Sequence, residues 1–311
     1  MYIHGSNLEQ KESHPTKYGD AISRKYLAEI RTAYNKWKSQ NLALSGPGSK
    51  STPKDQEIIG ARVKLLNDYK DFIDTQHYAE QFDSRSNLHS SVLEEFMYYL
   101  FHDMVRDISE HALLGKSHAF KDLFFKADSY QDMLRSPKIL IEKKDHDFAI
   151  GVRVDARFKS RGQTDEVQDS WDLPAVAIEC KTYLDKTMLQ DASTAAEQLK
   201  YRNPSALYIV VAEWLKLTEA VNLRKFKIDQ IYVVRKQKNT DREFRYDAAY
   251  KKNPIYPDVI AHLFTTVREF LTTPWEGGVN YGLTKGFLIT DRISEPKLNT
   301  GTSHSVNEDE P

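Results

Sequence analysis

The pattern of apolar residues changes along the chain after about residue 105. Before this point, helical spacing predicts helices over residues 20–40, 54–76 and from Ser90 or Ser91 onward. Beyond it, apolar runs predict strands over residues 148–154, 175–181, 206–211 and 228–234, and helical spacing predicts helices over residues 186–202 and 255–271. Asp20 and Asp185 are the expected N-caps of two of these helices. This order predicts an α/β fold with a helical N-terminal region.

The chain of 311 residues divides into three parts. Residues 1–85 form the helical N-terminal region, and residues 86–290 form the α/β core. Within the core, a polar segment, residues 159–172, separates the first two predicted strands. Residues 291–311 are polar with acidic residues near the end, so we expect a disordered tail.

Composition narrows the classes of protein to which the chain can belong. Forty-four Lys and Arg residues against 45 Asp and Glu residues give a net charge of −1, so contact with nucleic acid requires a local basic surface. No apolar run reaches the roughly 18 residues of a membrane helix, and residues 1–20 lack a secretory signal. We therefore expect a cytoplasmic protein without membrane contact. The single cysteine, Cys180, excludes an internal disulfide and a cysteine-based zinc site.

A Glu-x-Lys triplet ends the apolar strand predicted over residues 175–181. Side chains alternate along a strand, so Glu179 and Lys181 share one face and lie roughly 7 Å apart. The opposite, bulkier face holds Val176, Ile178 and Cys180. Other triplets of this kind occur, Glu142/Lys144 among them, but none of them ends an apolar strand.

The strand predicted over residues 148–154 has a similar design. Its bulky face is Phe148, Ile150 and Val152, whereas its small face begins with a carboxylate, Asp147. If the two strands are neighbours, Asp147 and Glu179 converge on one metal ion. Both ligands are oxygens, so we expect Mg²⁺. Asp145 is an alternative to Asp147, but it lies outside the apolar run.

Two carboxylates with a lysine suit the hydrolysis of a phosphodiester. A metal ion polarises a phosphate oxygen and lowers the pKa of a bound water. Lys181 could orient or deprotonate that water and stabilise the charge that develops on the phosphate. The alternative interpretation is a surface salt bridge near the end of a strand.

These residues resemble a known group of nucleases. Asp147 and the Glu179-Cys180-Lys181 triplet after an apolar strand resemble the PD-(D/E)xK superfamily, although His146 stands where that name has proline. The longer stretch, residues 177–188, resembles type II restriction endonucleases of the Bpu-type family. The resemblance covers roughly residues 90–235. It implies a mixed central sheet flanked by helices, cleavage of double-stranded DNA, and the main-chain carbonyl of Cys180 as a further metal ligand.

The resemblance also implies two helical site residues. Superfamily cores often carry a glutamate on the helix before the first catalytic strand and a glutamine on the helix after the Glu-x-Lys strand. Glu94 and Gln198 occupy those places. Glu94 lies about 100° from Leu93, at the border of the apolar stripe, whereas Glu95 falls nearly opposite the stripe, so we prefer Glu94. For both predicted residues, an ordinary solvated position is the alternative.

Two regions are candidates for contact with DNA. Residues 222–252 hold ten basic and four acidic residues, which suits a phosphate-contacting surface or an exposed hairpin. The basic residues of the N-terminal helices are the other candidate.

One carboxylate cluster acts on one strand at a time, so cutting both strands most simply requires two active sites. We expect a homodimer, or a heterodimer with a related subunit, which the family resemblance also implies. Two other functions stay open at this stage: a repair or mobile-element nuclease on the same core, and a non-cleaving DNA-binding or partner subunit.

Overall fold

The computed structural model describes residues 2–82, 87–135, 138–161, 166–238, 246, 249–275 and 278–286, so the predicted tail, residues 291–311, lies outside the described residues. The chain divides into two units, Met1–Thr273 and Pro274–Pro311. The first unit contains both the helical N-terminal region and the sheet. The second contributes one helix, α9 (Gly278–Lys285).

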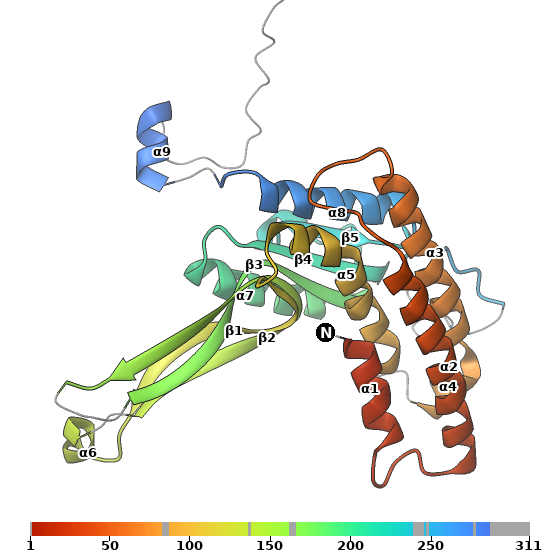
Figure 1. Cartoon of the computed structure of the whole chain (residues 1–311), viewed down its shortest axis with the longest axis horizontal. Coiled ribbons are helices and arrows are strands. Elements are labelled where there is room, and N and C mark those ends of the chain that lie inside the picture. Colours follow the sequence, from red (N-terminus) through yellow and green to blue (C-terminus); the bar gives the residue numbers. More distant parts are fainter. Residues whose placement is uncertain are drawn as a thin grey trace, which may run out of the picture. The chain divides into compact units, whose positions relative to one another are not determined.

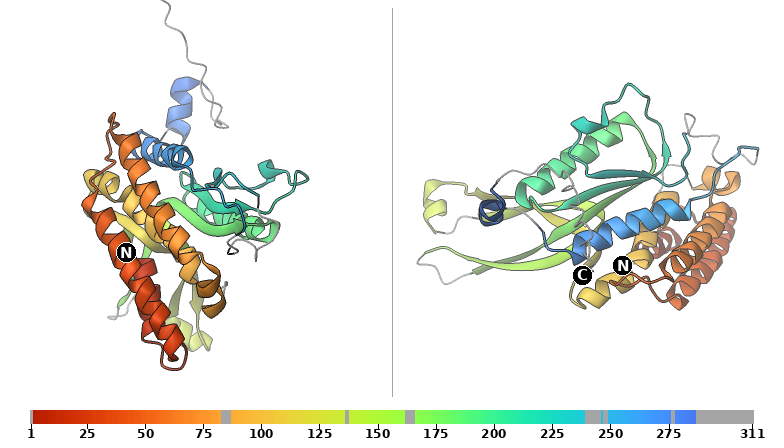
Figure 2. Two further views of the ribbon diagram at one scale, coloured as in Figure 1. Left: turned by 90° about the vertical axis from the view of Figure 1, so that its right-hand side faces the viewer. Right: turned by 90° about the horizontal axis from the view of Figure 1, so that it is seen from above.

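Five helices form the N-terminal part of the first unit. They are α1 (Ile3–Glu12), α2 (Ala21–Ala43), α3 (Asp55–Ile73), α4 (Gln76–Gln81) and α5 (Asn87–Ile108). The longer ones pack side by side (Figure 2). Asp20 caps α2, as predicted, because its Oδ1 accepts a hydrogen bond from the Ser23 amide at 2.8 Å. The sequence did not predict α1.

The core is a five-stranded mixed sheet. Its strands are β1 (Leu113–Lys126), β2 (Lys138–Lys159), β3 (Glu166–Leu184), β4 (Leu207–Leu215) and β5 (Gln230–Val233), in that spatial order. The β1–β2 and β2–β3 pairs are antiparallel, and the β3–β4 and β4–β5 pairs are parallel. The helix α7 (Lys186–Arg202) makes the crossover that a parallel pair requires. The mixed sheet flanked by helices is confirmed.

The outer parts of β1, β2 and β3 extend away from the helices, with the short helix α6 (Tyr130–Arg135) between β1 and β2 (Figure 1). The prediction of a polar connecting segment over residues 159–172 was therefore wrong for most of its length. β3 begins at Glu166 and pairs with β2 from Lys159–Glu166 inward. Backbone hydrogen bonds to the neighbouring strand keep these residues extended. The sequence pattern did not predict a strand here because it recognises strands by a buried apolar face.

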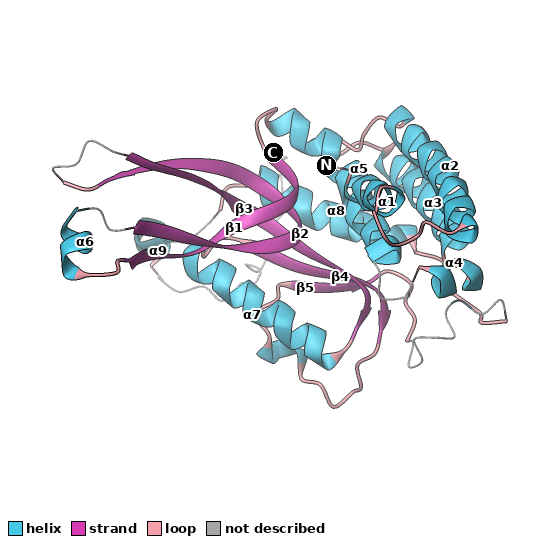
Figure 3. Cartoon of the chain, turned by 90° about the horizontal axis from the view of Figure 1, so that it is seen from below, coloured by secondary structure: helices cyan, strands magenta, loops and turns pink. Residues whose placement is uncertain are grey.

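Helices cover both faces of the inner sheet (Figure 3). On one face, Val176, Ile178 and Cys180 pack in one apolar cluster with α5 and α8 (Pro257–Thr272). On the other face, Ala177 packs with the apolar side of α7. The alternation predicted for β3 is confirmed. None of the described helices combines the length and apolar character needed to span a bilayer.

Candidate active site

The sheet divides where the predicted carboxylates lie. The register of β2 against β3 runs from Lys159–Glu166 to Phe148–Ile178. Beyond this last pair, β2 continues beside β1 and β3 continues beside β4. Asp147 and Glu179 are the next residues on the two strands, so the division of the sheet positions both carboxylates.

The structure brings Asp147, Glu179 and Lys181 together. Lys181 Nζ lies 2.5 Å from Glu179 Oε1 and 3.5 Å from Asp147 Oδ2. The Cys180 amide donates a hydrogen bond to Asp147 Oδ2 at 2.9 Å. The three side chains are each about one-fifth to one-quarter exposed, so they are partly shielded and still open to a ligand.

The charges of this trio shift its protonation equilibria. Burial and the Asp147 carboxylate raise the pKa of Glu179. Burial opposes the charge on Lys181, but the carboxylates of Asp147 and Glu179 outweigh it and raise the lysine pKa. In the metal-free protein Lys181 is therefore a protonated hydrogen-bond donor, which favours positioning of a water over its deprotonation.

Glu94 approaches the trio from α5. Burial, followed by the negative charge of Asp147, raises the pKa of Glu94 to about 8. Glu95 lies elsewhere on the helix, away from the trio. It is fully buried against α1 and α2, because α5 is covered on nearly all sides.

A cleft of about 520 Å³ opens beside the trio. Strand residues and one face of α7 line it, and they include Glu179, Lys181 and Gln198. Three of the predicted site residues thus share this cleft. Gln198 is half-buried there, and its side chain forms no hydrogen bond with any residue that the structure describes.

The main chain of Cys180 also faces the division of the sheet. Its amide points to Asp147, and the N–H and C=O groups of a strand residue point to the same edge. The thiol is instead buried with Val176 and Ile178, as predicted, and burial raises its pKa. Two carboxylates and one carbonyl are hard oxygen donors that fit Mg²⁺. No set of three His, Cys, Asp or Glu side chains gathers as a metal site within the described ranges.

Asp145, the alternative to Asp147, is engaged elsewhere on β2. Its Oδ1 lies 2.6 Å from His118 Nδ1, and its Oδ2 lies 3.5 Å from Lys116 Nζ. Its side chain is 56% exposed. These contacts leave Asp147 as the β2 carboxylate beside Glu179.

Two buried residues near the trio were not among the predicted site residues. Tyr208 on β4 lies close to Glu179, and burial together with that carboxylate raises the pKa of the phenol. The ring of His146 packs edge-on to it, with 5.7 Å between centroids. Tyr208 belongs to an apolar run that predicts only core, and His146 stands where the nucleases that the sequence resembles have proline.

The basic segment, residues 222–252, is not one continuous DNA-facing surface. Arg235 is fully buried and pairs with Glu213 at 3.0 Å, which corrects its predicted role. Lys236 and Lys252 pair with Asp258 and Asp71. The exposed residues of the segment include Arg224, Lys225 and Lys227, whereas Arg242 and Arg245 lie outside the described residues.

Arg62 of the N-terminal helices also has a structural role. Its side chain is only 2% exposed and donates to the carbonyls of Asn41, Leu44 and Gly46. It is therefore removed from the set of candidate DNA contacts.

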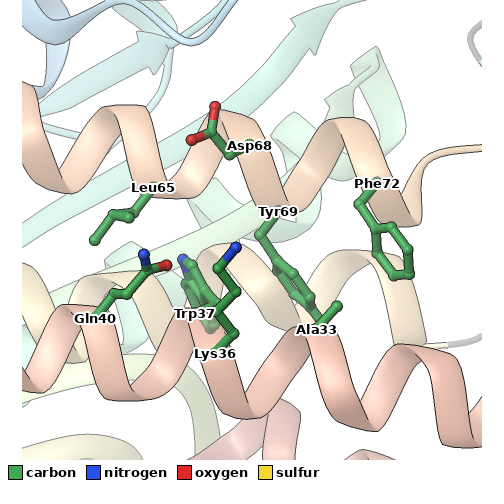
Figure 4. A pocket seen from close by; sticks show the side chains of 8 residues that line it. All are labelled: Ala33, Lys36, Trp37, Gln40, Leu65, Asp68, Tyr69 and Phe72. Carbon is green, nitrogen blue, oxygen red and sulfur yellow. The ribbon is translucent and has the colours of Figure 1, made fainter.

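A second hollow, of about 230 Å³, lies between α2 and α3 (Figure 4). Trp37 and Tyr69 stack there with their ring centroids 5.0 Å apart. Lys36 and Asp68 are its charged side chains. It lacks a pair of carboxylates and shares no residue with the trio, so the cleft beside α7 is the better candidate for the reaction.

Comparisons with known proteins agree with this geometry. A structure described as the native BbvCI A2B2 tetramer at low resolution is similar to the chain, with a TM-score of 0.64 and 19% identity over 88% of this chain and 96% of that chain. No curated protein matches. The family model for the Bpu10I restriction endonuclease matches residues 85–287. The chain therefore belongs to the Bpu10I restriction endonuclease family and is a type II restriction endonuclease, as the sequence predicted.

Proposed function

We propose that this endonuclease hydrolyses DNA with Mg²⁺ held by Asp147, Glu179 and the main-chain carbonyl of Cys180. The observation that carries the proposal is the convergence of two carboxylates and Lys181 where β2 and β3 separate. When bound, Mg²⁺ would polarise the phosphate and lower the pKa of a water. Mg²⁺ commonly binds one or two carboxylates together with substrate phosphates and water, which suits this small donor set.

The chain's own residues perform the other parts of this proposed reaction. Asp147 and Glu179 hold Lys181 between them, so its ammonium group can orient the attacking water and offset charge on the phosphate. Glu94 adds a third carboxyl group beside the pair. Gln198 lines the cleft and could donate a hydrogen bond to the DNA or to the water.

A cleavage assay on bacteriophage DNA with Mg²⁺ tests these roles. Discrete fragments are expected from the wild type, with the second subunit added if cutting of both strands requires it. Asp147→Asn is expected to lower the rate at least about a hundredfold, a typical loss for a group that stabilises a transition state. Asp145→Asn, on the same strand but paired with His118, is the matched control and should cut normally. Equal rates for the two variants would refute the assignment of Asp147.

We also propose a division of labour along the chain. Residues 86–290 carry the reaction, and the N-terminal helices of residues 1–85 assist DNA recognition. A variant that lacks α1 to α4 is not expected to be active, because these helices belong to the same compact unit as the sheet and do not form a separate domain.

We infer that the chain works with a related second subunit. One cluster of catalytic carboxylates serves one DNA strand, and the similar BbvCI structure is described as an A2B2 tetramer, a composition with two kinds of subunit. The purified chain alone should then nick supercoiled plasmid, and linear product should require the second subunit. Linear product from the chain alone, with a rate that rises with its concentration, would indicate a homodimer instead.

A further inference from the structure

The stretch of β2 before Asp147 carries adjacent lysines on opposite faces. Lys143 Nζ lies 2.7 Å from Asp169 Oδ1. Asp145, on the same face by strand alternation, pairs with Lys116 and His118. The cations on this face are therefore neutralised by neighbouring carboxylates.

Lys144 differs from Lys143 in the face of β2 that it occupies and in its ion pairing. It lines the catalytic cleft together with Glu179, Lys181 and Gln198, and its side chain is exposed. It forms no ion pair with any residue that the structure describes. Its cleft neighbour Lys121 is paired with Glu142.

The two charged residues of the Glu142-x-Lys144 triplet thus have different surroundings in the folded chain. Glu142 on β2 forms an ion pair with Lys121 on β1, whereas Lys144 is a solvated ammonium group on the wall of the cleft. A lysine is a compact point charge that suits phosphate without needing a fixed fork geometry. An anion that enters the cleft would gain this charge without breaking an ion pair of the protein.

We propose that Lys144 binds a backbone phosphate of the DNA strand that enters the cleft. The inference rests on the proposed function, because that function brings DNA to this cleft. Lys144 is then a DNA-binding residue, separate from the residues that hold the metal and the water. Its contribution should be independent of sequence, since phosphates carry no base identity.

The salt dependence of DNA binding tests this inference, with Lys143→Ala as the matched control. Binding is measured in the Glu179→Gln background with Mg²⁺, on a short duplex that spans a cut position mapped on bacteriophage DNA. The second subunit is added if cutting requires it. Lys144→Ala should weaken binding and reduce the slope of log K against log salt by about 0.9, the loss of one phosphate contact. Lys143→Ala and Lys144→Arg should keep the slope of the parent.

Three results would overturn the inference. The first is a slope for Lys144→Ala equal to that for Lys143→Ala. The second is an unchanged slope together with a lowered turnover at saturating DNA, measured with Lys144→Ala in the enzyme that keeps Glu179, which would assign the lysine to the chemical step. The third is a lower unfolding temperature of Lys144→Ala with normal binding by the folded fraction. A separate measurement tests the proposed function itself. If Glu179→Gln alone, with both lysines intact, still cuts DNA, the proposed function fails.

Discussion

The chemistry of Glu94 depends strongly on its surroundings. It reaches the Asp147 and Glu179 carboxylates from α5, and burial together with Asp147 raises its pKa from 4.5 to about 8. An acid with a raised pKa in the fold stabilises the folded state below its ordinary pKa, and this contribution is lost as pH rises through the raised value. The metal-free enzyme should therefore lose stability between about pH 5 and pH 8.

Glu94→Gln tests this pH dependence. The amide cannot ionise, so the variant should show a flatter dependence of unfolding temperature on pH across this range, measured with EDTA present. Cleavage with Mg²⁺ should fall. An unchanged pH dependence would show that Glu94 is not protonated in the fold.

The approach of Glu179 and Lys181 could be predicted because its signal is local. Glu179 and Lys181 lie two residues apart at the end of an apolar strand, so alternation alone places them on one face. Tyr208 could not be predicted as a neighbour of Glu179, because β4 pairs with β3 only in the folded chain. The burial of Arg235 likewise depends on a distant partner, Glu213.

At the scale of elements, α1 owes its place to one buried carboxylate on α5. Glu95 Oε2 accepts from the amides of His4 and Gly5 at 2.9 and 3.1 Å. Its Oε1 accepts from the hydroxyls of Tyr34 and Tyr99. Such long-range bonds leave no periodic mark in the sequence, which explains why α1 was not predicted.

Glu95→Ala should release α1 from α5. The variant leaves two amides and two hydroxyls without their acceptor, so we expect the free energy of unfolding to fall by about 3 kcal/mol or more. Urea unfolding measures this loss. The neighbouring Glu94→Gln should change the unfolding midpoint far less at pH 5, and a Glu95→Ala midpoint equal to that of the wild type would contradict this role of Glu95.

The ends of the strands could not be predicted from sequence patterns as well as the ends of the helices. The α7 boundaries and the Asp185 cap were predicted, because helical spacing and capping are local. The outer part of β2 keeps an alternation of half-buried and exposed residues over residues 154–159, whereas β3 begins with three exposed residues, 166–168, where alternation is missing. Pairing between the two strands, which only the fold provides, makes these polar residues extended.

At the scale of the whole molecule, a buried ionic network joins the helical region to the sheet. Lys70 Nζ on α3 lies 3.1 Å from Asp74 Oδ2 and 2.8 Å from Glu213 Oε1 on β4. Glu213 Oε2 in turn pairs with Arg235 Nη2 at 3.0 Å. Breaking a buried pair leaves an uncompensated charge, which typically costs about 3–5 kcal/mol.

Lys70→Met should lower the free energy of unfolding by about that amount, in one transition, because the helices and the sheet form one unit. Although burial opposes it, Lys70 holds the pKa of Asp74 below its ordinary value of 3.8. The stabilisation is present above this pH and is lost as pH falls below it, so the variant should be less sensitive to acid.

The control for Lys70→Met is Lys64→Met, on the same helix. Lys64 pairs with Asp68 at the surface, with side chains 74% and 59% exposed, so its loss should cost at most about 0.5 kcal/mol. Equal losses of stability for the two variants would contradict the role of the buried network.

The rate of DNA cleavage by Lys181→Ala decides whether the site between β2 and β3 performs the reaction. The variant keeps Asp147 and Glu179 and removes only the ammonium group that they hold. We predict that it binds the mapped duplex in Mg²⁺ as the wild type does and cuts it at least about a hundredfold more slowly. Cutting at near the wild-type rate would place the catalytic centre elsewhere in the chain.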